Sequence, residues 1–372
     1  MINGKNVLGI LYTDTYNDCI SELTALRTAG SVPFGGRYRF IDFPLSNMVN
    51  SGISKVGVIA KSNYRSLMDH VGTGKSWDLS RKNSGLFILP PYNFGGGQYS
   101  GKLEALRNTM DFIQASNEEY ILLCDTNIIC NMDISKLVDY HEDKGADITI
   151  CCNDGVYPQL SNLMRFTPDA DGRIRKMTVP PQAEAGEGTY GVNIIVMKKS
   201  LLERLVNQAT AGDYDIFEKE VIMKNLDKLN VYSYKIDTYC AVIDSMQKYY
   251  DTNMDLLDPA ISADVFDREN PVYTKVHDDM PSIFGIGSKA KNCVIADGCK
   301  IEGEVENSVL FRGVQVAKGA VVKNSVIMQA CYIGEDANLN CVIMDKNGVI
   351  RPRKSISGDT TYPIYIGKNI TI

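Results

Sequence analysis

The first residues of this chain that could do chemistry follow its first predicted strand. The apolar run Val7–Tyr12 predicts a buried parallel strand, and the loop Thr13–Cys19 comes directly after it. A loop that cradles phosphates needs glycines, because backbone N–H groups must approach the phosphates without obstruction by a Cβ atom. This loop, TDTYNDC, contains no glycine, arginine or lysine and carries two aspartates. On charge alone it is a poor triphosphate site.

A second strand, predicted over Tyr120–Ile129, becomes polar toward its carboxyl end at Asp125 and Asn127. In doubly wound sheets, ligands bind at the carboxyl ends of the strands. A nucleotide site needs carboxylates there, because Mg²⁺ must bridge and neutralise the phosphates. The period of two places both side chains on one face of the strand, roughly 6–7 Å apart.

The stretch Val32–Gly52, VPFGGRYRFIDFPLSNMVNSG, also carries chemistry. Its diglycine predicts a turn at a nucleotide pocket, and a helix is expected to begin near Asp42. Basic side chains that attract phosphate lie in the stretch and just after it, at Arg37, Arg39 and Lys55.

Length and composition exclude several functional classes. The chain has 372 residues, enough for two domains, and 23% charged and 44% hydrophobic residues are ordinary for a globular protein. The net charge of -6 gives no indication of a nucleic-acid partner. We recognise no signal peptide and no apolar run near the ~20 residues that a membrane span needs.

Cysteine and histidine usage limits the possible sites further. The ten cysteines form no CxxC pair, which favours reduced thiols in a cytoplasmic protein over disulfides or a zinc site. With only three histidines, histidine-based catalysis or metal binding has little material. We therefore expect no metal and no cofactor of that kind.

Strands and helices alternate through residues 1–258, which indicates an α/β domain with a Rossmann-like, mostly parallel sheet. Residues 259–282 are rich in turn residues and are expected to be a linker. The predicted elements, besides those above, are strands at Val56–Ala60, Asp147–Asn153, Tyr190–Met197 and Leu229–Ile236, helices at Arg65–Val71 and Ile134–Asp143, and a hairpin over Leu163–Pro180.

Residues 283–372 contain an internal repeat. A four-residue unit recurs at Asn292–Ile295, Asn307–Leu310, Asn324–Ile327 and Asn340–Ile343. Hexapeptides such as IGSKAK, VAKGAV and IGEDAN lie between these units. Periodic aliphatic and glycine residues are typical of a left-handed parallel β-helix, in which each coil buries its aliphatic row only against stacked neighbours. A β-sandwich is the less favoured alternative.

The stretch Val32–Gly52 resembles the signature VPFGGxYRxIDFxLSNxxNSGI of the ADP-glucose pyrophosphorylase (glucose-1-phosphate adenylyltransferase) family. The resemblance covers nearly the whole chain, including the β-helix. It implies synthesis of ADP-glucose from ATP and glucose 1-phosphate, with Mg²⁺ held by two aspartates.

Several functional positions of that family are changed in this chain. The arginine of the glycine loop is replaced, and so are the RxKP lysine, the first metal-binding aspartate, the sugar-phosphate site and the second metal-binding aspartate. In that order, the replacements are Cys19, Ala29, Asn127, Val179 and Val242. The resemblance leaves Gly35, Gly36, Arg37, Gly101, Asp125 and Gly191 as remnants of the nucleotide and sugar pocket.

The pattern of losses implies a catalytically silent regulatory subunit. Its expected partner is a catalytic subunit, in a hetero-tetramer, with a homo-oligomer as the alternative for the chain alone. Sugar-phosphate effectors are expected, with Arg351, Arg353 and Lys354 as candidate ligands, although such a cluster is commonly a solvated face.

Two alternatives remain open on the sequence. The chain could be an active sugar nucleotidyltransferase in which Asp125 and Asp244 carry Mg²⁺. It could also be a hexapeptide acyltransferase, but no catalytic histidine lies in the coils, since His277 precedes them.

Overall fold

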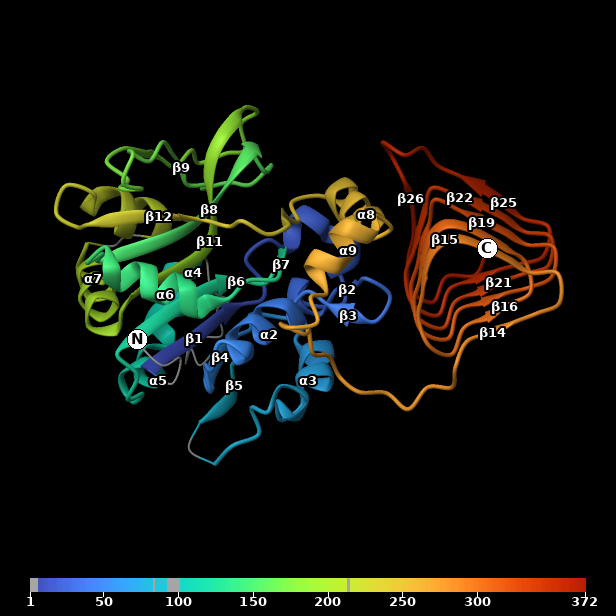
Figure 1. Cartoon of the computed structure of the whole chain (residues 1–372), viewed down its shortest axis with the longest axis horizontal. Coiled ribbons are helices and arrows are strands. Elements are labelled where there is room, and N and C mark those ends of the chain that lie inside the picture. The colour runs from blue at the N-terminus through green and yellow to red at the C-terminus, as the bar shows by residue number, and fades with distance from the viewer. Residues whose placement is uncertain (1–5, 83, 92–100, 213–214) are drawn as a thin grey trace.

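A computed structural model describes residues 6–82, 84–91, 101–212 and 215–372. An α/β domain built on one large sheet lies beside a second domain of stacked parallel coils (Figure 1). These are the two architectures that the sequence predicts. None of the helices within the described ranges is both long enough and apolar enough to cross a membrane.

The large sheet has nine strands and is parallel in its central part. β1 lies between β4 and β6, and β11 runs antiparallel to both β6 and β8. The strands are β1 (Val7–Tyr12), β4 (Lys55–Ile59), β5 (Gly85–Leu89), β6 (Tyr120–Asp125), β8 (Ile148–Val156), β9 (Arg165–Phe166), β10 (Met177–Thr178), β11 (Glu187–Lys198) and β12 (Val231–Lys235).

Helices cover both faces of this sheet, so the central strands are apolar at successive positions. In β1, Leu8 and Ile10 pack into one buried cluster, while Val7 and Leu11 pack into the other. The first face is covered by α4 (Lys102–Asn108), α5 (Met110–Gln114) and α7 (Lys199–Ala211), and the second by α2 (Asp42–Asn50), α3 (Arg65–Val71) and α6 (Ile134–Asp143).

The strand predicted over Tyr120–Ile129 is two strands, which corrects the sequence analysis. Thr126 donates from both its N–H and its hydroxyl to the Tyr12 carbonyl, each at 3.1 Å, and the chain bends there. β6 ends at Asp125, and β7 (Ile128–Cys130) pairs antiparallel with β13 (Cys240–Val242) in a separate ribbon. Asp125 and Asn127 therefore do not share one face of one strand.

The predicted linker 259–282 is not entirely irregular. It begins with α9 (Pro259–Val265), which is capped by the Asp258 carboxylate accepting from the Ala260 N–H at 2.8 Å. α9 follows α8 (Met246–Asp255) directly, and both lie on the side of the α/β domain that faces the coils (Figure 1). Proline in the first turn of α9 suits a helix start, because its missing N–H would be unpaired there.

The second domain is a parallel β-helix, and the repeated units stack in register. Val294, Val309, Val326 and Ile343 are successive partners in one ladder. The strands of its walls are β14 (Ile283–Phe284), β15 (Lys289–Ile295), β16 (Lys300–Ile301), β17 (Glu304–Leu310), β18 (Gln315–Val316), β19 (Val321–Lys323), β20 (Val326–Ile327), β21 (Tyr332–Ile333), β22 (Asn338–Asn340), β23 (Val342–Met344), β24 (Val349–Ile350), β25 (Ser355–Ser357) and β26 (Ile364–Ile366).

The repeated asparagines turn the corners of the coils. Asn292, Asn307 and Asn324 have φ values of 51°, 45° and 45°, in the left-handed region that asparagine tolerates better than most residues. Their amides also form a ladder: Asn292 donates to Asn307 at 2.9 Å, and Asn324 donates to Asn340 at 2.9 Å. The asparagine of the repeat thus serves both the turn and the stacking.

An apolar cluster joins the two domains. Phe34 and Tyr249 of the α/β domain are buried in the same cluster as Val309, Phe311 and Val326 of the coils. The diglycine of Val32–Gly52 lies at this contact. Gly35 and Gly36 have φ values of 58° and 84°, and a Cβ on Gly36 would lie 3.3 Å from Val294. The predicted turn is confirmed, but it faces the β-helix.

Candidate functional site

The ends of β1 and β6 lie side by side, because Tyr12 and Asp125 are register partners. α4 begins beside them with Lys102, and this is the residue that the sequence analysis missed. The Lys102 ammonium lies 2.7 Å from Asp125 Oδ2 and donates a hydrogen bond to Glu218 Oε1 at 2.8 Å. Glu218 comes from the short π-helix η5 (Phe217–Ile222). Three distant segments therefore meet at one cation.

This ion triad is closed off from solvent. The side chains of Lys102, Asp125 and Glu218 are 8%, 2% and 7% exposed. The Lys102 ammonium also lies 5.8 Å and 5.6 Å from the ring centroids of Tyr12 and Tyr16, at cation–π distance. Although burial opposes the charge, the Asp125 and Glu218 carboxylates raise the pKa of Lys102 well above its ordinary value. Lys102 therefore stays charged at neutral pH.

Lys102 also lines the pockets on both of its sides. One is a pocket of about 90 Å³ at the end of β1, next to Thr13, Asp14 and Lys61. It is small beside the roughly 300–1,000 Å³ of typical ligand pockets. The other, of about 400 Å³, is lined by Asp215 and Glu218 among others. These carboxylates disfavour a phosphate there.

The two positions where the family holds metal carry no carboxylate. Asn127 donates from Nδ2 to the Ile243 carbonyl at 3.0 Å, and its own carbonyl accepts from the Ile243 N–H at 2.8 Å. Val242 is buried in the apolar cluster of the sheet. Both residues hold the β7–β13 ribbon together.

Mg²⁺ does not fit this arrangement. The carboxylate closest to the family position, Asp125, is ion-paired with Lys102, and its site already contains one positive charge. No group of three or more metal-ligating side chains occurs within the part of the chain that the structure describes.

Asp125 and Asp244 make separate contacts, so the alternative magnesium pair has no geometric support. Asp244 accepts from the Gln159 N–H at 2.6 Å and from the Ser245 hydroxyl at 2.8 Å. Cys19, at the position of the family arginine, lies near Asp244. Burial, helped by Asp244 and Asp18, raises the pKa of its thiol to about 11. A neutral thiol beside carboxylates is the electrostatic opposite of an arginine that binds phosphate.

Other residues expected near the pocket are used for packing. Ala29 and Val179 are buried in apolar clusters, and Gly191 lies within β11, where a Cβ would meet Met164 at 3.0 Å. Gly101 is the N-cap of α4 and does line both pockets. Of the six predicted pocket remnants, the structure brings together Gly101 and Asp125. It places Gly35 and Gly36 at the domain contact instead.

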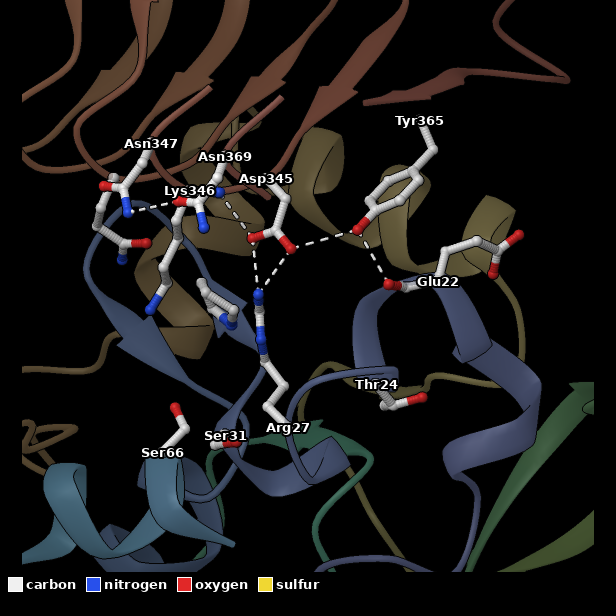
Figure 2. A network of polar contacts seen from close by, with 12 residues as sticks. Glu22, Thr24, Arg27, Ser31, Ser66, Asp345, Lys346, Asn347, Tyr365 and Asn369 are labelled. Carbon is white, nitrogen blue, oxygen red and sulfur yellow. Dashed lines mark hydrogen bonds and ion pairs between the residues drawn. The ribbon is translucent and has the colours of Figure 1, made fainter. Parts of the chain in front are cut away.

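A second polar cluster lies between the two domains. Figure 2 shows Arg27 pointing from the α/β domain toward Asp345 of the β-helix. Arg27 Nη2 donates to both carboxylate oxygens of Asp345, at 2.9 Å and 2.6 Å. The Tyr365 hydroxyl lies 3.2 Å from Asp345 Oδ2 and donates to the Glu22 carbonyl at 2.9 Å. The cluster therefore ties the last coils to the start of the chain.

Positive charge exceeds negative charge around this ion pair. Lys346 follows Asp345, and burial together with the positive charges of Arg39 and Arg27 lowers its pKa to about 7. Burial likewise lowers the pKa of Arg39 to about 10. Arg39 donates to the Ser66 carbonyl at 2.8 Å and to its hydroxyl at 3.0 Å. Neither Arg39 nor Lys346 forms a salt bridge that would balance its charge within the described residues.

The basic residues near the C-terminus lie elsewhere. Arg351, Arg353 and Lys354 are exposed on the last coils, where their backbone groups form hydrogen bonds with Ile372, Glu335 and Asn338. The cations that converge are instead Arg39, predicted as phosphate-seeking, and Lys346, which the sequence analysis did not single out. Arg37 is exposed and donates to the Tyr38 hydroxyl at 3.0 Å.

The sequence gives little indication that Lys102 and Arg27 belong to buried polar clusters. Lys102 is a charged residue in the first turn of a helix, next to the glycine Gly101 that the pocket was expected to use. Arg27 lies just before the signature stretch Val32–Gly52. Nothing local to either residue indicates its carboxylate partner.

Comparison with known proteins agrees with the two-domain fold. Residues 20–257 match the profile of the nucleotidyl transferase family. The chain belongs to this family. Residues 282–362 of the chain match the profile described as GlmU-like, C-terminal hexapeptide.

Two similar proteins cover nearly the whole chain. The glycogen biosynthesis protein GlgD of Bacillus subtilis (strain 168) is 35% identical over 371 residues, covering 100% of this chain and 98% of that protein. The glucose-1-phosphate adenylyltransferase of Fervidobacterium nodosum is 33% identical over 353 residues, covering 93% and 84%. The chain thus belongs to the glucose-1-phosphate adenylyltransferase group that the sequence signature indicated.

Proposed function

We propose that this chain is a regulatory subunit of a glucose-1-phosphate adenylyltransferase in glycogen biosynthesis, with no adenylyl transfer of its own. The observation that carries the proposal is the Lys102 ammonium between Asp125 and Glu218. The names of the similar proteins supply the pathway and the reaction.

The electrostatics of the site support catalytic silence. Adenylyl transfer depends on a divalent cation and basic groups that stabilise charge on the phosphates. In this chain the cation at the site is the Lys102 ammonium, which is ion-paired with Asp125 and Glu218. The basic residues that the family carries in and after its glycine loop are replaced. Each lost contact of this kind costs on the order of 10²–10³ in rate, so several losses together abolish turnover.

The scaffold supports a role in an assembly. The domain contact is well packed, with Phe34, Phe311 and Tyr249 fully buried. A chain that keeps the fold but has no active site can still act by binding a partner. We therefore propose a catalytic subunit of the same enzyme as the partner, in a cytoplasmic hetero-tetramer.

The excess positive charge near Arg39 and Lys346 supports a response to phosphorylated effectors. The two cations come from different domains, so an anion bound to both would stabilise the present domain arrangement. This cluster replaces Arg351, Arg353 and Lys354 as the proposed effector site.

The deciding experiment measures ADP-glucose synthesis by the purified chain, by a catalytic subunit from the same organism and by their mixture. We expect no turnover by this chain alone, and a changed maximal rate or effector response in the mixture. Turnover by the chain alone, at a rate comparable to that of the catalytic subunit, would overturn the proposal. A Lys102→Ala variant of this chain serves as a control, because contaminating enzyme would be unaffected by it.

A further inference from the structure

Two cysteines face each other across the β7–β13 ribbon. Cys130 and Cys240 are register partners in this antiparallel pair. The sequence separates them by more than a hundred residues, and they have no local pattern that would indicate contact. Both side chains pack in the same apolar cluster, and all ten cysteines are free.

The hydrogen-bond pattern of the ribbon places this pair at a favourable position. The Ile243 N–H donates to the Asn127 carbonyl, which makes residues 127 and 243 a hydrogen-bonded pair. Such pairs alternate with non-hydrogen-bonded pairs along an antiparallel ladder. Counting along the register, 129 and 241 form the next hydrogen-bonded pair, so Cys130 and Cys240 form a non-hydrogen-bonded pair.

This geometry meets the requirement of a disulfide. Residues of a non-hydrogen-bonded pair have Cα atoms about 4.5 Å apart and side chains on the same face. Disulfides span Cα separations of about 4.4–6.8 Å. The bond can therefore form without moving either strand far.

The adjacent cysteines Cys151 and Cys152 offer a contrast. They are consecutive in β8, so their side chains point to opposite faces of the sheet and pack into different apolar clusters. They cannot pair while β8 stays extended. Cys130 and Cys240 can form a disulfide because the fold places them opposite each other on adjacent strands.

We propose that Cys130 and Cys240 form a redox modification site, which closes to an intrachain disulfide by exchange with a small disulfide such as oxidised glutathione. This inference is independent of the proposed function.

The exchange has two steps, and the chemistry balances. The Cys240 thiolate attacks one sulfur of the small disulfide, forming a mixed disulfide and releasing one small thiol. The Cys130 thiolate then attacks Cys240 Sγ, forming the intrachain bond and releasing the second small thiol. Two protein thiols are oxidised while one small disulfide is reduced to two thiols. Cys240 is the entry point because it is half-buried, whereas Cys130 is 2% exposed.

The rate of closure should depend on pH. The neighbouring Cys130 thiol, together with burial, raises the pKa of the Cys240 thiol well above its ordinary value. The thiolate is scarce at neutral pH, and exchange should become faster as the pH rises. Asn47 Nδ2 donates to Cys130 Sγ at 3.9 Å.

The test treats the reduced full-length chain with oxidised glutathione and then alkylates the remaining thiols under denaturing conditions. We expect a peptide containing Cys240 to be linked to one containing Cys130, with the mass of two hydrogen atoms lost. We also expect the Tm to rise by about 5 °C, because the bond closes a long loop, and reduction should reverse it.

Matched variants distinguish this pair from its neighbours. Cys124 and Cys151 lie in the same apolar cluster, so Cys124→Ser and Cys151→Ser should keep the linked peptide. Cys130→Ser should abolish it and leave a glutathione adduct on Cys240, and Cys130→Ala serves if the serine variant does not fold. An intrachain link that persists without Cys130 would overturn the proposal. So would a native chain that retains both thiols or stops at the glutathione adduct.

Discussion

Arg27 and Asp345 form a buried ion pair across the boundary between the two domains, in which Arg27 Nη2 donates to both carboxylate oxygens at 2.9 and 2.6 Å and the side chains are only 4% and 3% exposed. The pair has a defined geometry and little solvent screening. It connects the position of the β-helix to the segment that precedes the signature Val32–Gly52.

Removing one partner of this pair should destabilise the protein strongly. Asp345→Ala leaves Arg27 buried beside Arg39 and Lys346 without its counter-charge. We expect a loss of about 3–5 kcal/mol in the free energy of unfolding, measured by denaturant titration. Arg27→Met combined with Asp345→Leu should recover a large part of that loss. If Asp345→Ala unfolds at the denaturant concentration of the native chain, the pair is not a structural contact.

Replacing Lys102 should open a cation site. In Lys102→Ala, the carboxylates of Asp125 and Glu218 lose their counter-charge, so the variant should be less stable. It should then gain thermal stability on addition of Mn²⁺, whereas the native chain should not. Binding at 100 times Kd would contribute about 2.7 kcal/mol.

The control for this prediction is Lys61→Ala, which changes another lysine at the pocket beside Lys102. It should not create a response to Mn²⁺. Lys102→Gln offers a milder change if the alanine variant is too unstable to purify. An equal Mn²⁺ response of the native chain would contradict the assignment of Lys102 as the resident cation.

Sulfate binding should weaken as the pH rises through about 7. The pKa of Lys346 is lowered to about 7, so its side chain is charged below that pH and increasingly neutral above it. Sulfate remains a dianion throughout this range, so a loss of affinity between pH 6 and pH 8 reports the titration of a group on the protein. We expect a decrease of several-fold, measured by titration calorimetry.

The matched variants for this measurement are Lys346→Met and Lys354→Met. The first should bind sulfate weakly, with little pH dependence. The second changes an exposed lysine on the last coils and should behave like the native chain. Binding that is lost in Lys354→Met and kept in Lys346→Met would return the effector site to the C-terminal basic cluster.

Asn324 should be more sensitive to alanine than to glycine. Its φ of 45° is costly for alanine by roughly 1–2 kcal/mol, whereas glycine adopts it freely. Both variants lose the amide ladder, in which Asn324 donates to Asn340 at 2.9 Å. The difference between their unfolding free energies therefore isolates the backbone cost. Equal stabilities of the two variants would show that the left-handed corner contributes nothing.

The sequence repeats predict that the second domain is a β-helix, and the structure confirms this prediction. A recurring Asn-x-aliphatic unit specifies both a left-handed corner and an inward apolar row, and each coil repeats this short unit. The alternation of apolar runs with helices in the first domain is similarly local. The bend at Thr126 was missed because it depends on the Tyr12 carbonyl of a neighbouring strand.

The candidate site could be recognised in the sequence only from the residue types that are missing at the family's positions. Asn127 and Val242 indicated that metal ligands were gone, because valine and a neutral amide are poor substitutes for carboxylates. What occupies the site instead could not be predicted. Lys102 meets Glu218 across 116 positions of sequence, and Arg27 meets Asp345 across 318.

The sequence by itself determined the two architectures, the order of their elements and the loss of the family's charged groups. These follow from periodicity, turn-forming residues and side-chain chemistry, which act over a few neighbouring positions. Only the tertiary structure decided where the remaining charges go. An ion pair forms where two elements cross, and the crossing depends on the packing of the whole sheet and of the coils against it. That packing directs Lys102 between two carboxylates, Cys130 opposite Cys240 and the diglycine turn onto the β-helix.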